Sequence, residues 1–149
     1  MGADLTSGAG PYAADMATTA TPLPQGTEKA AAVRGMFDAI APRYDLVNRV
    51  MTFGLDRSWR RTTVTELGLP AGSVVLDLAT GTGDLCAEAE HQGLTPIGID
   101  LALGMLQASH ASAPRAQGDI TRLPLPDEVV DGAVCGFALR NVVSLDALF

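Results

Sequence analysis

A strand, a glycine-containing turn and a helix follow one another near the middle of the chain, and this unit limits the possible folds more than any other segment. Residues 74–79 form a short apolar run rich in branched side chains, as in a strand buried in a parallel sheet. Thr80-Gly81-Thr82-Gly83 then turns the chain, and residues 84–92 are predicted to form a helix that ends at Gly93. The unit predicts a layered α/β fold.

The same alternation continues toward the C-terminus. Further strands are predicted over residues 95–100, 115–118 and 131–137, with a second helix over residues 103–112. Strands that alternate with helices are joined by right-handed crossovers into a parallel sheet. We therefore expect a Rossmann-like cofactor-binding domain with flanking helices over residues 71–149.

The remaining chain has two parts. Residues 1–26 are mostly Ala, Thr, Gly and Pro and cannot bury enough apolar area to offset the entropy lost on ordering, so a disordered tail is expected. Residues 27–70 are predicted to form a helical cap segment. Its three helices are expected around residues 27–41, 45–51 and 56–68.

The last residues suggest that the chain stops inside an element. Ser144 is a suitable helix N-cap, yet only Leu145 to Phe149 follow it, and one turn cannot repay helix nucleation. We expect a C-terminal truncation that leaves the N-terminal half of the sheet, with the strand at 131–137 as a bare apolar edge. Such a chain is expected to aggregate or to bind its cofactor weakly.

The charge excludes one class of partner. The chain carries −7 at pH 7 with a pI near 4.6, the opposite of what binding to phosphate backbones requires, so no nucleic-acid partner is expected. The window from Lys29 to Thr63 holds seven basic and three acidic side chains and is therefore +4. It suits peripheral contact with an anionic membrane, and a solvated face is the alternative.

The sequence also indicates a compartment. No run approaches the ~20 apolar residues that span a bilayer, and the first residues lack the features of a secretory signal. Cys86 and Cys135 are therefore expected to be reduced thiols. We expect a cytoplasmic protein, with peripheral contact to the inner face of the membrane as an option.

Two strand acids flank the glycine turn. Asp77 lies within the first strand, and Asp100 closes the second, where a carboxylate suits hydrogen bonds to ribose hydroxyls. Gly81 and Gly83 let the backbone approach a ligand closely. The sequence thus predicts a nucleoside or nucleotide site at the carboxyl edge of the sheet. The alternative without a ligand is a helix cap at Asp84 and an exposed Asp100.

Charge favours S-adenosylmethionine over a dinucleotide. The dinucleotide fingerprint has a third glycine where this chain has Cys86, and Asp84 opens the helix where a pyrophosphate would lie. Carboxylates close to a diphosphate, here Asp77 and Asp84, repel it by several kcal/mol. S-adenosylmethionine has no phosphate and carries an ammonium and a sulfonium, so it is the expected cofactor.

Four segments, in the same order, resemble the family of ubiquinone/menaquinone biosynthesis C-methyltransferases. The glycine motif of that family is similar to the segment from Val74 to Leu85. Its N-terminal signature is similar to Phe37-Asp38-x-Ile40-Ala41-x-x-Tyr44-Asp45-x-x-Asn48 followed by Phe53-Gly54-x-x-Arg57-x-Trp59. Two further segments of that family are similar to Leu123-Pro124-Leu125-Pro126-Asp127 and Phe137-Ala138-Leu139-Arg140-Asn141-Val142.

The resemblance implies a class I S-adenosylmethionine-dependent methyltransferase and assigns contacts by position. The cofactor contacts of the family fall on Thr82, Asp100, Asp119 and Ile120, in addition to the turn residues above. A further contact, usually a serine, is Gly136 here. Other departures are Val47 for methionine, Asp56 for histidine and Thr80 for glycine, and the C-terminal Lys-Pro-Gly-Gly turn is absent.

The implied reaction is transfer of a methyl group to a ring carbon of a polyprenylated quinol, from demethylmenaquinol to menaquinol or the benzoquinol equivalent. Arg140 is expected to stabilise the developing phenolate or to hold a water that accepts the hydroxyl proton, and Asn141 is expected to orient the ring. Local pairing of the arginine and a turn at the asparagine are the alternatives. Tyr44, Asn48 and Trp59 are expected to cover the substrate, unless the aromatic side chains only pack the cap.

Two other functions remain open. The chain is alternatively a class I methyltransferase for a small O, N or S nucleophile, or an inactive fragment that serves as an interaction module. His91 and His110 have no partners at ligand spacing, so no metal is expected. The quinone type and the oligomeric state are not determined by the sequence.

Overall fold

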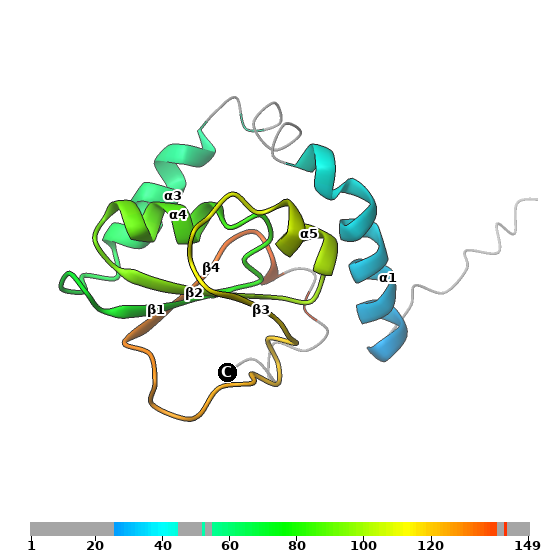
Figure 1. The fold of residues 1–149 in the computed structure, drawn as a ribbon. Helices are drawn as coiled ribbons and strands as arrows, with labels where there is room; N and C mark the ends of the chain where they lie inside the picture. The colour runs from blue at the N-terminus through cyan, green and yellow to red at the C-terminus, as the bar shows by residue number, and fades with distance from the viewer. Residues whose placement is uncertain (1–25, 45–51, 53–54, 140–141, 143–149) are drawn as a thin grey trace, which may run out of the picture.

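The chain forms a parallel sheet with helices packed on one face and a further helix alongside (Figure 1). The computed structural model describes residues 26–44, 52, 55–139 and 142. The elements in chain order are α1 (Gly26–Ile40), the 3-10 turn η1 (Ala41–Arg43), α3 (Asp56–Thr65), β1 (Val74–Leu78), α4 (Asp84–His91), β2 (Thr95–Asp100), α5 (Leu103–Ala108), β3 (Arg115–Gln117) and β4 (Gly132–Cys135).

The sheet has the order β3-β2-β1-β4, and every pairing in it is parallel. The connections β1–α4–β2 and β2–α5–β3 place both helices over the same face, as crossovers of one hand require (Figure 1). The chain then returns along the other face, over residues 118–131, to β4 (Figure 1). Because β1 has β2 on one side and β4 on the other, the crevice typical of ligand sites lies at its carboxyl end. The predicted α/β class is confirmed.

The element boundaries follow the prediction closely, with three clear differences. The helix predicted over residues 56–68 ends at Thr65, and the strand predicted over residues 131–137 covers only Gly132–Cys135, because the chain turns with a positive φ at Phe137. β2 has the predicted bounds, whereas α5 was predicted to reach residue 112 and ends at Ala108. Ser109 has an extended backbone, with ψ at 140°, and its hydroxyl accepts a hydrogen bond from the Ala111 N–H at 3.3 Å. A serine that binds the nearby backbone in this way offers an alternative to the next helical turn. The expected tail and the expected helix at 45–51 lie outside the described residues.

The helices attach to the sheet in two different ways. The core beneath α3 and α4 is formed by Val64, Val75, Leu85, Ala89, Leu94 and Val134. By contrast, none of the residues of α1, all of which are described, is buried. α1 is held by Phe37 against Met105 and by two polar contacts. Asp38 Oδ1 accepts a hydrogen bond from the Gly104 N–H at 2.7 Å, and Lys29 Nζ donates to the Val142 carbonyl at 3.0 Å. In the described part of the chain, no helix is long and apolar enough to cross a membrane.

A branched ion pair joins α3 to the N-terminus of α4. Arg60 Nη2 lies 2.7 Å from an oxygen of Asp56 and 2.7 Å from an oxygen of Asp84. The Asp56 side chain is only 6% exposed, whereas that of Asp84 is 40% exposed. Asp56 Oδ1 has no hydrogen-bond partner among the described residues. Arg60 is therefore the main compensation for a charge that is otherwise buried.

We expect Arg60→Met, which keeps the length of the side chain and removes its charge, to lower the free energy of unfolding by roughly 3 kcal/mol or more, because Asp56 is left buried and unpaired. Asp84→Asn breaks only the exposed arm and should cost about 1 kcal/mol or less. Chemical denaturation of the purified protein measures both. Equal losses for the two variants would contradict the asymmetry.

Candidate active site

Two adjoining hollows lie at the carboxyl edge of the sheet. The first, the α1 hollow, is bounded by α1, the end of β2 and residues 118–121, and it holds about 850 Å³ of space that is partly open to solvent. The second, the α3 hollow, is bounded by α3, β1 and the glycine turn, and it holds about 740 Å³ of space that is also partly open to solvent. The residues that line both hollows, called the seam below, are Tyr44, Ala79, Gly81, Gly136 and Phe137.

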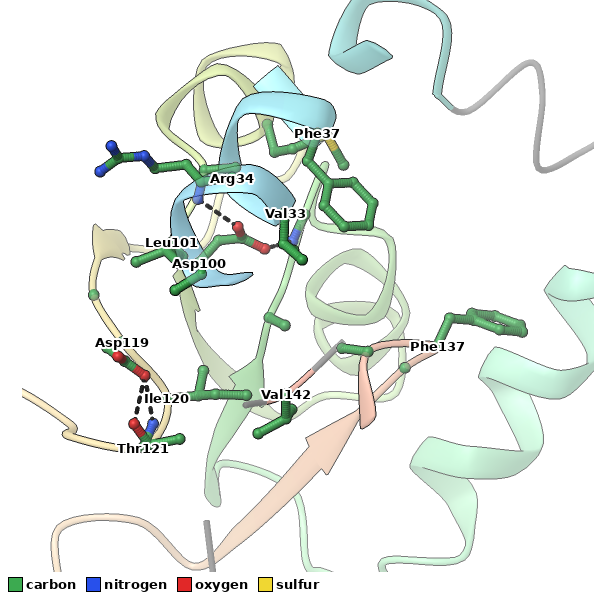
Figure 2. A pocket seen from close by; sticks show the side chains of 18 of the residues that line it. Val33, Arg34, Phe37, Asp100, Leu101, Asp119, Ile120, Thr121, Phe137 and Val142 are labelled. Carbon is green, nitrogen blue, oxygen red and sulfur yellow. Dashed lines mark hydrogen bonds between the residues drawn. The ribbon is translucent and has the colours of Figure 1, made fainter. Parts of the chain in front are cut away.

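Asp100 fixes the glycine turn beside the α1 hollow (Figure 2). Its carboxylate accepts hydrogen bonds from the Gly81 N–H and the Ala102 N–H, each at 2.8 Å. Burial raises the pKa of this carboxyl, and the two N–H donors act in the opposite direction. Each carboxylate oxygen keeps further lone-pair capacity, so a ligand hydroxyl can still donate to it. The side chain therefore ties the turn to β2 and also faces the hollow.

Asp77 faces the neighbouring α3 hollow and is almost completely buried, with 1% of the residue exposed. Its Oδ2 accepts a hydrogen bond from the Thr80 hydroxyl at 2.6 Å and from the Cys86 thiol at 3.5 Å. Its Oδ1 has no partner among the described residues. Burial raises the pKa of Asp77 to about 6, with a smaller contribution from the charge of Asp100, while the hydrogen bonds from Thr80 and Cys86 lower it. A cationic group in the hollow would find an unsatisfied acceptor here.

Asp84 contributes less negative charge to the crevice than the sequence suggested. Its carboxylate is paired with Arg60, which lines the same hollow. The acidic character of the site therefore rests on Asp77 and Asp100. These two carboxylates line adjoining hollows that share the seam residues, and they are close enough for the charge of one to raise the pKa of the other.

Thr80 has a steric partner that the sequence analysis did not identify. Its backbone N–H donates to the Ile99 carbonyl at 3.0 Å, which brings the side chain over Gly98 on β2. A Cβ at position 98 would lie 2.8 Å from Thr80 Cγ2, closer than side chains tolerate. A glycine inside a strand pattern often marks such a close approach. That signal is present in Ile97-Gly98-Ile99.

Most of the other predicted residues line one or both of the hollows. Thr82 and Trp59 line the α3 hollow, Asp119 and Ile120 line the α1 hollow, and Tyr44, Gly81 and Gly136 line both. Gly83 lines neither; it has a φ of +87°, and a Cβ there would lie 2.6 Å from Ser109 Oγ. Three predicted residues, Asn48, Arg140 and Asn141, lie outside the described residues.

Cysteines and possible metal ligands add no further centre. Cys86 is buried and Cys135 half-buried, and both carry free thiols. Burial raises the pKa of Cys86 to about 12, so its thiol stays protonated and is a poor nucleophile at neutral pH. In the ranges that the structure describes, no three His, Cys, Asp or Glu side chains come together in a way that could hold a metal ion.

Comparison with known protein families and sequences gives a consistent result. The model of the ubiE/COQ5 methyltransferase family matches residues 25–148. A demethylmenaquinone methyltransferase of Mycolicibacterium paratuberculosis is 45% identical over 116 residues, which cover 77% of this chain and 50% of that protein. A ubiquinone/menaquinone biosynthesis C-methyltransferase of Syntrophotalea carbinolica is 44% identical over 119 residues, which cover 74% of this chain and 50% of that protein. The chain spans about half the length of the curated relatives it matches.

Solved structures show the same fold. A putative S-adenosyl-L-methionine-dependent methyltransferase from Methanococcus maripaludis superposes with a TM-score of 0.65 at 15% identity, over 75% of this chain and 55% of that one. A putative methyltransferase from an antibiotic biosynthesis pathway of Anabaena variabilis has a TM-score of 0.58 at 28% identity, over 61% of this chain and 38% of that one.

Asp77 should give the ligand-free protein a pH-dependent stability. Because its pKa is raised by folding from 3.8 to about 6, the folded state binds the proton more tightly, and stability is lost as the pH rises from about 4 to 6. Asp77→Asn removes this loss. We expect the variant to gain about 3 kcal/mol over the wild type above pH 6 and little below pH 4. Urea titrations across this pH range measure the difference, and a gain that is independent of pH would contradict the assignment.

Proposed function

Because the chain belongs to the ubiE/COQ5 methyltransferase family, we propose that it acts in the C-methylation of a polyprenylated quinol, with S-adenosylmethionine as the methyl donor. The names of its relatives support the class of substrate, as demethylmenaquinol or the benzoquinol equivalent. One observation of the site carries the choice of donor: Asp77, which lines the hollow beside the glycine turn, has a buried acceptor oxygen, Oδ1, with no hydrogen-bond partner among the described residues.

The donor set fits S-adenosylmethionine. Asp100 would accept hydrogen bonds from the ribose hydroxyls in the α1 hollow, and Asp119 and Ile120 would lie beside the adenine. Asp77 Oδ1 would accept a hydrogen bond from the ammonium group, together with the backbone of Gly81 to Gly83. A diphosphate fits poorly, because Asp77 and Asp100 would both repel it at close range.

The work of the protein is then mainly one of positioning. The bound cofactor supplies an electrophilic methyl group on a sulfonium, so the chain has to hold a ring carbon in line with it. The seam is the natural meeting point, since its residues border both hollows. Tyr44 and Trp59, with Asn48, would cover the acceptor and exclude water. Residues 27–70 would thus act as the cap of a cofactor-binding domain at residues 71–149.

Arg140 and Asn141 are proposed as the catalytic pair. They follow β4 in the sequence, and the carboxyl end of β4 lies on the same edge of the sheet as the glycine turn, where ligand-binding residues of this architecture gather. The ring carbon becomes a good nucleophile when the neighbouring hydroxyl loses its proton. The guanidinium of Arg140 would stabilise the resulting phenolate, and the amide of Asn141 would orient the ring.

A polyprenylated acceptor resides in a membrane, so the protein has to approach one. The window from Lys29 to Thr63, which is +4, is the proposed contact with anionic lipid head groups at the inner face of the membrane. The protein would then be cytoplasmic and bind the membrane peripherally. Asp84, which lies outside this window, pairs with Arg60 and lowers the charge available for that contact.

The proposed activity is tested directly with the purified full-length protein. Methyl-labelled S-adenosylmethionine is incubated with a short-chain demethylmenaquinol, a demethylated benzoquinol, a catechol and a primary amine. We expect label on a ring carbon of one quinol and none on the catechol oxygen or the amine. Methylation of the catechol or amine alone would favour a different methyltransferase, and tight cofactor binding without transfer would exclude the quinol activity.

Arg140→Ala tests the catalytic pair in the same assay. Loss of a donor to a developing oxyanion typically costs about 100-fold in kcat, and we expect a fall of that order with an unchanged Kd for the cofactor. Arg122→Ala, which removes an exposed arginine before β4, serves as the control and should keep full turnover. A fall of less than about threefold for Arg140→Ala would rule out its role.

A further inference from the structure

Two large aromatic side chains that line the α3 hollow pack against each other and keep much of their surface exposed. Phe137 is 56% exposed and Trp59 is 48% exposed, and both line this hollow. Their ring centroids lie 6.2 Å apart with the planes tilted by 47°. Figure 2 shows the Phe137 ring directed away from Asp100. Exposed aromatic area at a pocket wall is unfavourable in water and is typical of a surface that an apolar ligand covers.

The backbone of Phe137 provides a second, independent observation. Its φ is +58°, in the left-handed region that bulky residues rarely adopt. Such a conformation persists where the surrounding structure enforces it, and it is concentrated at ligand-binding positions. Here it follows directly on Gly136, whose missing Cβ leaves room for Leu85: a Cβ there would lie 2.8 Å from Leu85 Cδ1. This left-handed backbone conformation places Phe137 where it lines both hollows.

The position of Phe137 relative to the carboxylates indicates what the pair binds. Asp77 lines the α3 hollow, and its buried Oδ1 has no hydrogen-bond partner in the described part of the chain, so this carboxylate is the acceptor for a cationic group there. The aromatic pair, unlike Asp77, presents an apolar surface that carries no charge. Because Phe137 lines both hollows, a ring held against it lies at the seam, next to whatever occupies the α1 hollow.

We propose that Phe137 is a substrate-binding residue which, with Trp59, holds the aromatic ring of the methyl acceptor. This inference rests on the proposed function and adds a residue and a binding mode to it. The pair binds one face and one edge of the ring, so it selects planar acceptors independently of the length of their prenyl chain. The prenyl chain would bind elsewhere.

Steady-state kinetics of the full-length protein test this with two quinols, one with a long prenyl chain and one without a chain. Phe137→Ala is expected to raise the KM for both quinols about tenfold, because it removes an aromatic contact. The Kd for S-adenosylmethionine, measured by calorimetry, should change less than twofold. Phe137→Tyr, which keeps the ring, should retain the KM of the wild type.

Two controls separate this role from a structural one. Val129→Ala removes an apolar side chain that is also largely exposed and lines neither hollow, and it should leave every constant unchanged. Phe137→Gly removes the ring and the unfavourable φ together, so its Tm should equal or exceed that of the wild type while its KM rises as for Phe137→Ala. A fall in Tm with an unchanged KM would make Phe137 a packing residue and overturn the proposal.

The remaining outcomes are equally distinct. An effect only on the long-chain quinol would mean that Phe137 contacts the prenyl chain, and an effect only on cofactor binding would mean that the pair holds the sulfonium. Either result overturns the proposal and leaves the proposed function standing. A wild-type protein that transfers no methyl group to any quinol would instead remove the proposed function itself.

Discussion

The hydrogen bond between the Asp100 carboxylate and the Gly81 N–H, at 2.8 Å, holds the site together. It connects the end of β2 to the turn after β1, and the second oxygen of the same side chain caps the start of the segment that leads into α5. Both hollows are shaped by the turn that this contact fixes. The parallel register of β1 with β2 makes the contact possible, because it brings the carboxyl ends of the two strands to one edge.

Within the cap, α1 is attached to the sheet less firmly than α3 is. α3 contributes Val64 to the core and is linked to α4 through Arg60. α1 forms one wall of a hollow without burying any of its own residues. The hydrogen bond that the Gly104 N–H donates to Asp38 of α1 favours a residue without a side chain at position 104, because a Cβ there would lie 2.9 Å from the carboxylate. The wall next to α1 is thus the part of the site that can move with the least disruption of the core.

Local patterns in the sequence were sufficient for the sheet and for the acids at its edge. The strand at residues 95–100 is bounded by turn residues and ends in Asp100, and both features are visible without a structure. The end of α5 was not visible, because the side chain of Ser109 takes over a backbone partner. The pairing of Arg60 with Asp84 depends on how α3 crosses α4, and the left-handed Phe137 depends on tertiary packing. Such features arise between elements, which a linear pattern does not encode.

The contact between Thr80 and Gly98 has a consequence for how this sequence can change. The threonine methyl group occupies the volume that any side chain at position 98 would need. Gly98→Ala is therefore tolerated only after Thr80 has been replaced by a smaller residue. If Gly98→Ala comes first, the new Cβ overlaps the Thr80 side chain. The two positions are therefore coupled, although they lie far apart in the sequence. In a library that varies both, the tolerated pairs should be those that conserve their combined volume.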